Sequence, residues 1–208
     1  GGSEEPMNGS VTRPPVDGGP PTVEKPLIVQ SDRSVLLEVD NASYHDARDR
    51  ISRFAELEKS PEHIHFYRIT PLSIWNAAAA GMTDEEMVAA LRDFGRYDLP
   101  RNVEKDIREY VRRYGLVRLE RRGEDMVLIS DDPVIMTEVA RNPLTKRYLL
   151  ESDDKDVLRM DPAFRGHLKQ AMIKIGYPVE DLAGYVKGEH FPIVLSASLA
   201  GNGRAFAL

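Results

Sequence analysis

Apolar and polar residues recur along the first ordered part of the chain in patterns that predict a hairpin, a helix and a strand. The β-prone runs Leu27–Val29 and Val35–Val39 flank a polar turn at 30–34, which predicts a β-hairpin. From Tyr44 to Leu57 the apolar residues follow helical spacing, and the alternation from His63 to Ile69 predicts a further strand. We expect this strand to join the hairpin in one small sheet.

Three helical patterns and a second hairpin come next. A threonine N-cap followed by proline opens a helix over 71–80, and a capping box begins a second helix at Thr83. A third helix runs from Pro100 to Gly115. The runs Leu116–Leu119 and Met126–Ile129, separated by a polar turn, predict the hairpin. Three short helices followed by a hairpin is the order of a winged helix.

Beyond this hairpin the pattern predicts a second unit that begins with short elements. A helix is expected over 134–140, and a break at Asn142-Pro143 precedes a further piece that ends at Leu150. Val157–Met160 follows as a short strand amid acidic residues.

The rest of the second unit is predicted to be one helix, a turn and an extended segment. The helix covers 162–175, and its apolar face consists of Phe164, Leu168, Ala171, Met172 and Ile175. A helical turn at 180–183 and an extended run at 192–195 follow.

These elements predict an α+β fold: a small sheet with helices that contains a winged-helix-like segment of three helices and a hairpin, followed by a small α/β unit. The first residues alternate glycine with proline and hold almost nothing apolar that could be buried. The expected segments are a disordered lead-in at 1–26, a main domain at 27–150, a small α/β domain at 151–195 and a linker at 196–208.

Composition narrows the class of protein. The 208 residues are 41% hydrophobic and 30% charged, which fits a globular chain of one or two domains. A formal net charge of -6 gives no basic surface over the whole chain, so nucleic-acid contact would be local. The absence of cysteine excludes disulfides, thiolate zinc sites and cysteine nucleophiles. No apolar run has the length of a membrane span and no signal-peptide pattern opens the chain, so we expect a cytoplasmic location and no membrane partner.

One stretch is locally basic. Between Arg101 and Arg122 there are eight basic residues against four acidic ones, a surplus that would support phosphate contacts. A solvated helix face and a protein-docking surface are the alternatives, because two glutamates precede arginines at i, i+4 spacing. The candidate DNA- or partner-binding residues are Arg108, Arg112, Arg118 and Arg121, with Lys169 and Lys174 of the second unit as weaker phosphate contacts.

The sequence offers no catalytic or metal-binding constellation. It contains no Gly-x4-Gly-Lys-Ser/Thr phosphate loop and no Gly-x-Ser-x-Gly nucleophile elbow. His63 and His65 share one strand face without a third ligand at diagnostic spacing, and the acidic residues between 151 and 161 lack a calcium-loop pattern. We therefore predict no catalytic residue, no metal and no cofactor in this chain.

Five long phrases carry a family resemblance. They are PLIVQSDRSVLLEVD at 26–40, FAELEKSPEHIH at 54–65, YRITPLSIWNAA at 67–78, GHLKQA at 166–171 and GYPVEDLAGY at 176–185. These phrases resemble the N-terminal region of bacterial XPB-type DNA repair helicases, and the resemblance extends from about Pro26 to the last residue.

The resemblance implies a function for the region as part of a longer protein. In this family it precedes a superfamily 2 motor of two RecA-like domains, which uses ATP and Mg2+ as a 3'-to-5' DNA helicase. The ending at 203–208 is similar to the stretch just before the motor, so we expect the chain to stop where the motor would begin. ATP and Mg2+ would then belong to the parent protein, and this chain would be inactive alone.

The resemblance also implies partners. The part at 27–150 is similar to a module that in eukaryotic relatives docks onto another subunit of the transcription and repair factor TFIIH, and 151–195 occupies the place of a damage-recognition domain in archaeal relatives. We expect a non-catalytic regulatory and docking region that binds DNA weakly and without sequence preference, its own motor, and a protein partner of unknown identity. The alternatives are a stand-alone winged-helix DNA-binding regulator and a pure protein-interaction module.

Overall fold

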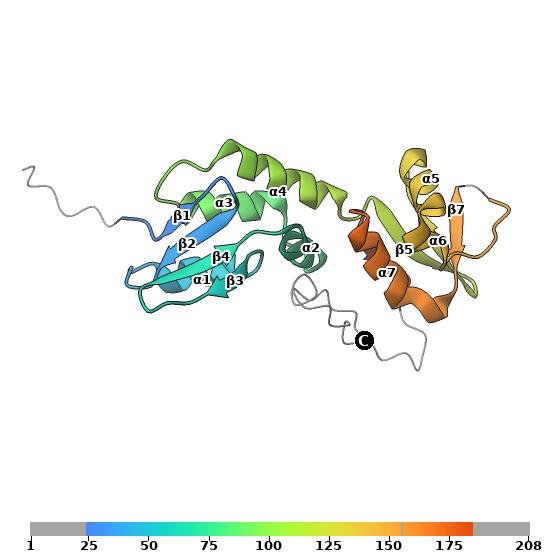
Figure 1. Cartoon of the computed structure of the whole chain (residues 1–208), viewed down its shortest axis with the longest axis horizontal. Helices are drawn as coiled ribbons and strands as arrows, with labels where there is room; N and C mark the ends of the chain where they lie inside the picture. The colour runs from blue at the N-terminus through green and yellow to red at the C-terminus, as the bar shows by residue number, and fades with distance from the viewer. Residues whose placement is uncertain (1–23, 155, 185–208) are drawn as a thin grey trace, which may run out of the picture.

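The computed structural model describes residues 24–154 and 156–184, which form two units, each built on a four-stranded sheet (Figure 1). The α+β class predicted from the sequence is confirmed. Most of the predicted lead-in at 1–26, the extended run at 192–195 and the linker at 196–208 lie outside the described residues.

The first sheet joins the predicted hairpin to the later strand. Val35 of the hairpin faces Tyr67 of that strand across the ladder, and both side chains are buried, as the alternation predicts. The sheet is antiparallel throughout in the order β1-β2-β4-β3. Its strands are β1 (Leu27–Val29), β2 (Ser34–Glu38), β3 (Glu56–Lys59) and β4 (Ile64–Arg68).

Four helices complete the core of the first unit. Trp75, the single tryptophan, is 5% exposed and donates from Nε1 to the carbonyl of Tyr110 at 2.9 Å, which ties the second of these helices to the fourth. Val103 and Ile107 are fully buried in the same core. The helices are α1 (Tyr44–Ile51), α2 (Pro71–Ala79), α3 (Asp84–Phe94) and α4 (Arg101–Arg113).

The second sheet has the order β7-β6-β5-β8 and a core of its own. Its central hairpin pairs antiparallel with β7 and parallel with β8. The strands are β5 (Val117–Arg122), β6 (Asp125–Ile129), β7 (Val157–Met160) and β8 (Val179–Asp181). The helices are α5 (Pro133–Arg141), α6 (Pro143–Lys146), the 3-10 helix η1 (Pro162–Phe164) and α7 (Arg165–Lys174).

Side-chain caps fix where most of these helices begin. Thr70 accepts a hydrogen bond from the amide of Ser73 while the Ser73 hydroxyl accepts from the amide of Thr70, which is a reciprocal capping box. Thr83 caps α3 through the amide of Glu86. In the second unit the capping side chains are Asp132, Asn142 and Asp161.

Three local predictions were wrong. The helix expected over 44–57 ends at Ile51, and residues 56–59 form β3 because they pair with β4. The turn expected at 180–183 is instead largely strand, since Val179–Asp181 pairs with β5. Phe164 does not join the buried face of its helix: it is 41% exposed and ends a 3-10 turn, while α7 begins only at Arg165.

The order of three helices and a hairpin is confirmed, but the two parts belong to different cores. The helix α4 buries Val103 and Ile107 in the first core, whereas the hairpin buries Leu119 and Leu128 in the second. A winged helix needs its hairpin beside the third helix. The described residues therefore do not show the winged-helix packing predicted from the order.

The two units meet at the end of α4. Gly115 turns the chain from α4 into β5 with a φ of +87°, a left-handed conformation that suits glycine. Arg113 lies over the ring of Tyr177 at 5.8 Å and reaches the carbonyl of Gly176 at 3.5 Å. Since β5 and β6 share a sheet with β7 and β8, the boundary predicted at 150 falls within the second sheet.

Candidate functional site: the charged surface of α4

The helix α4 is amphipathic, so its charged residues lie on the outer surface of the first unit. Val103 and Ile107 point into the core, while Arg101, Lys105 and Arg112 are exposed. These three cations line a shallow depression together with Glu104, Arg108 and Glu109.

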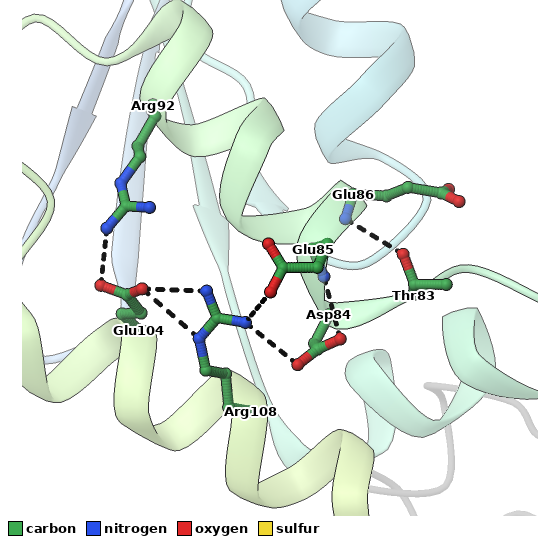
Figure 2. A network of polar contacts seen from close by, with 7 residues as sticks. All are labelled: Thr83, Asp84, Glu85, Glu86, Arg92, Glu104 and Arg108. Carbon is green, nitrogen blue, oxygen red and sulfur yellow. Dashed lines mark hydrogen bonds and ion pairs between the residues drawn. The ribbon is translucent and has the colours of Figure 1, made fainter.

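Arg108 is held by three carboxylates, so its charge is already compensated (Figure 2). Its guanidinium donates to Glu104 Oε1 at 3.0 Å, to Asp84 Oδ2 at 3.1 Å and to Glu85. The hydrogen bonds to these carboxylates, that to Glu85 first, raise the pKa of Arg108 above its ordinary value. Glu104 is shared with Arg92 at 2.7 Å, which extends the network to the last turn of α3.

Arg112 is more open than Arg108. Its side chain is 62% exposed and pairs with Glu109 at 2.8 Å, a contact that raises the pKa of Arg112 and lowers that of Glu109. Exposed i, i+3 pairs of this kind are weak and exchange readily with solvent or another anion. Arg112 can therefore turn toward a phosphate at little cost.

The structure does not bring the predicted arginines of the hairpin onto α4. Arg118 lies on β5, where it contacts Glu120 at 3.8 Å and Asp131 at 3.5 Å. Arg121 lies further along β5, opposite Met126, and is half-buried. Both belong to the second sheet, whereas Arg108 and Arg112 lie on α4 of the first unit, so the four predicted arginines come from two elements of different units.

The two predicted lysines have different surroundings. Lys169 is 12% exposed and pairs with Asp181 at 3.0 Å, and Arg165 forks onto the same carboxylate at 2.7 and 2.9 Å. Burial lowers the pKa of Lys169, while for Asp181 the two cations overcome the opposing effect of burial and lower the pKa of the carboxyl. This buried cluster anchors β8 to α7. Lys174, in contrast, is exposed at the end of α7.

Exposed cations outside the predicted set include Arg101 and Lys105 on α4 and the pair Lys146 and Arg147. Lys146 and Arg147 end α6, and within the part of the chain that the structure describes neither has a carboxylate within 4.0 Å. The signal in the sequence is the run Lys-Arg-Tyr at 146–148, a basic pair next to an aromatic residue.

Residues 24–154 and 156–184 form neither a metal-binding cluster nor a membrane-spanning helix. Among them, no group of three or more His, Cys, Asp or Glu side chains is placed to hold a metal ion. No helix in these ranges combines the length and apolarity needed to cross a bilayer.

Two single substitutions distinguish the role of Arg108 in stability from the role of the exposed cations in DNA binding. Arg108→Ala removes the shared partner of three carboxylates, so we expect a lower Tm and only a small loss of duplex affinity. Lys105→Ala removes the same charge from an exposed position, so we expect little change in Tm and a larger loss of affinity. Thermal unfolding and fluorescence anisotropy measure the two effects, and equal losses of affinity would contradict this division.

Fold and site define a two-unit α+β protein whose candidate site is the charged outer surface of one helix. The family model described as "Helicase conserved C-terminal domain" matches residues 27–158, and the chain belongs to this family. It is homologous to the N-terminal part, about 30%, of bacterial XPB helicases.

Individual relatives show how similar the chain is to these helicases and how much of each one it covers. The chain is 47% identical over 171 residues to "DNA 3'-5' helicase XPB" of Mycobacterium tuberculosis and 45% identical over 172 residues to that of Kineococcus radiotolerans, in each case over 82% of this chain and 31% of the relative. A helicase/translocase subunit XPB of general transcription and DNA repair factor IIH, from Enterocytozoon bieneusi, is 27% identical over 79% of this chain and 27% of its own length. The chain thus spans about a third of the relatives it matches.

Proposed function

We propose that this chain is the non-catalytic, DNA- and partner-docking region of an ATP-dependent 3'-5' DNA helicase of the XPB type. The observation that carries the proposal is the 45% and 47% identity to two bacterial proteins of that name, which extends over both units of the chain. ATP and Mg2+ belong to the motor of the parent protein, and the docking region supplies contacts that position this motor on DNA.

The exposed cations of α4 are the part of the surface best suited to contact a DNA backbone. Arg101, Lys105 and Arg112 line the same shallow depression as Arg108, but their side chains are more exposed than that of Arg108. Lysine and arginine on such a face release counterions from DNA when they contact phosphates, which gives binding that is weak, independent of sequence and sensitive to salt.

Duplex binding tests this assignment. The double variant Lys105→Ala/Arg112→Ala is expected to bind a fluorescein-labelled duplex more weakly, and the slope of log K against log salt is expected to fall by about 2, since each lost phosphate contact contributes about 0.9. Anisotropy titrations at several salt concentrations measure both quantities.

A matched control removes two positive charges elsewhere. The side chains of Arg48, in α1, and Arg53, just after it, are 42% and 53% exposed. Since α1 lies apart from α4 (Figure 1), Arg48→Ala/Arg53→Ala should leave the slope unchanged. An equal fall in both double variants would show a net-charge effect and reject the α4 surface. A strong preference for one duplex sequence would instead favour a DNA-binding regulator.

Two further experiments test whether the chain lacks ATPase activity of its own and whether it binds the motor domains. We expect the chain to hydrolyse no ATP above a buffer control in the presence of DNA, and to bind the separately expressed motor domains in a pull-down that survives nuclease treatment. Clear turnover by the chain alone would refute the proposal. Binding to the motor with no DNA affinity at any salt concentration would assign the chain to protein interaction only.

A further inference from the structure

Three aromatic rings gather in the second unit, where Phe164 and His167 are exposed and Tyr148 is half-buried against the second core. Tyr148 follows α6, Phe164 ends η1 and His167 lies in the first turn of α7. The centroid of the Tyr148 ring is 5.6 Å from that of Phe164 and 5.8 Å from that of His167, and Phe164 and His167 are 5.9 Å apart. We call these three residues the aromatic triad.

The backbone under the triad is fixed. The amide of Tyr148 donates to the carbonyl of Thr145 at 3.1 Å, and Leu149 pairs with Met160 at the edge of the second sheet. The side chain of Asp161 caps η1 through the amide of Ala163 at 3.0 Å, and this cap fixes the turn that carries Phe164. A rigid base of this kind holds aromatic rings in one arrangement before any ligand binds.

Core packing does not account for the position of Phe164. The second core is filled from α7 by Leu168, Ala171 and Met172, all buried, whereas Phe164 is 41% exposed and His167 is exposed. Large apolar rings left at the surface and clustered with other rings commonly mark a contact site.

Uncompensated positive charge lies directly beside the triad. The guanidinium of Arg147 lies 5.4 Å from the centroid of the Tyr148 ring, and Lys146 precedes it. Within the described ranges neither cation pairs with a carboxylate, in contrast to Arg108 and Lys169. Exposed rings next to free cations suit a ligand that has both an aromatic face and a negative charge, which is the chemistry of a nucleotide with an unpaired base.

We propose that the aromatic triad is a stacking site for an unpaired base of single-stranded DNA, with Arg147 and Lys146 contacting the adjacent phosphates. This inference rests on the proposed DNA-docking function and adds a ligand class to it. The duplex backbone contacts α4, whereas bases that have lost their partners stack on Tyr148 or Phe164. A base inside a duplex keeps its faces against its neighbours and cannot use such a site.

Binding of the full 208-residue chain to oligothymidylate tests the site. Phe164→Ala or Tyr148→Ala is expected to weaken binding of a fluorescein-labelled 15-mer by about 5- to 100-fold, since the loss of one stacked base by alanine substitution is of this order. A 2-aminopurine placed in the same oligonucleotide should be quenched by the wild-type chain and less by either variant. Duplex affinity should stay within about twofold of the wild type, because the contacts with α4 are untouched.

Two further variants separate stacking from fold and from general apolarity. Tyr97→Ala removes a ring that is 70% exposed outside the triad and should change neither affinity. Phe164→Leu keeps an apolar side chain without a ring, so it should lose affinity for the single strand while its Tm stays near that of the wild type. Single-strand affinity that Phe164→Leu and Tyr148→Ala leave unchanged would overturn the stacking site.

The outcomes distinguish this site from the α4 surface. Loss of single-strand binding in the triad variants supports the stacking site even if duplex binding proves absent, a result that would refute only the α4 assignment. Salt-sensitive duplex binding with no measurable affinity for the 15-mer would overturn the stacking site and leave the proposed function standing. No binding to either DNA would overturn both.

Discussion

Replacing Asp181 with alanine is expected to lower the free energy of unfolding of the second unit by about 3 kcal/mol, because it leaves two buried cations without their shared anion. The side chains of Arg165 and Asp181 are 10% and 12% exposed, and Lys169 is equally enclosed at 12%. Little water can therefore replace the lost carboxylate. Urea unfolding followed by circular dichroism measures the change.

The other members of the cluster provide an internal comparison. Lys169→Met removes an ammonium group whose pKa burial already lowers, and Asp181 keeps its two hydrogen bonds from Arg165. We expect a loss below about 1 kcal/mol for this variant. Asp49→Ala breaks an exposed pair with Arg48 and should change stability less still. A Lys169→Met variant that is as unstable as Asp181→Ala would contradict the central role of the carboxylate.

The pH dependence of the Asp181 effect follows from the lowered pKa of its carboxyl. A carboxyl whose pKa is lower in the folded than in the unfolded chain stabilises the fold at every pH above its unfolded pKa, about 3.9. This contribution is lost as the pH falls from there through the folded pKa. The difference in stability between the wild type and Asp181→Ala should therefore be constant near neutral pH and shrink in the acid range.

Helices were predicted well because their signals are local. The cap at Thr70, the spacing of apolar residues in α4 and the glycine at 115 each act within a few residues, and all three have the predicted effect in the structure. The short strands β3 and β8 were missed because their sequences favour no particular element. Each becomes a strand only through a partner far along the chain, β4 for one and β5 for the other.

The winged-helix packing predicted from the order of elements is not shown by the described residues, for a related reason. Order along the chain predicts which elements exist, but it does not say which hydrophobic core each element enters. The left-handed turn at Gly115 sends the hairpin away from α4, and its apolar residues then pack with β7, β8 and α7 instead. A pattern of single elements cannot contain this information, because the strand pairs that decide it join residues at least 28 positions apart.

The sequence shows which residues of the candidate site are basic, but it does not show which of these cations are paired with acidic residues in the fold. The i, i+4 spacing already pairs Glu104 with Arg108, but the sequence does not show that Asp84 and Asp181, 24 and 12 residues away, also hold Arg108 and Lys169. The exposed cations Lys105 and Arg147 carry no such partner among the described residues. Whether a cation can contact a ligand depends in part on acidic residues far along the chain. The structure is therefore needed to show which cations are available.

The second core should respond to mutation separately from the first. Leu119 is fully buried in the centre of the second sheet, where it faces Leu128 on β6 and Asp181 on β8. Leu119→Ala removes buried methyl groups and leaves a cavity, so we expect a loss of about 3 kcal/mol in the unfolding free energy of this unit. Leu57→Ala, at an edge-strand position that is 52% exposed, is the matched control and should cost below about 0.5 kcal/mol.

Trp75 allows the location of this loss to be read directly. It is the single tryptophan and is buried on α2 of the first unit, where it donates to the carbonyl of Tyr110. Its fluorescence therefore reports on that unit, whereas circular dichroism reports on both. Among the described residues the side-chain contacts that join the units are few, chiefly those of Arg113 with Gly176 and Tyr177. We therefore expect Leu119→Ala to produce an earlier transition by circular dichroism while the urea midpoint from Trp75 fluorescence stays near the wild-type value. Equal shifts of both probes would show that the two sheets unfold as one cooperative unit, because coincident transitions by different probes indicate all-or-none unfolding.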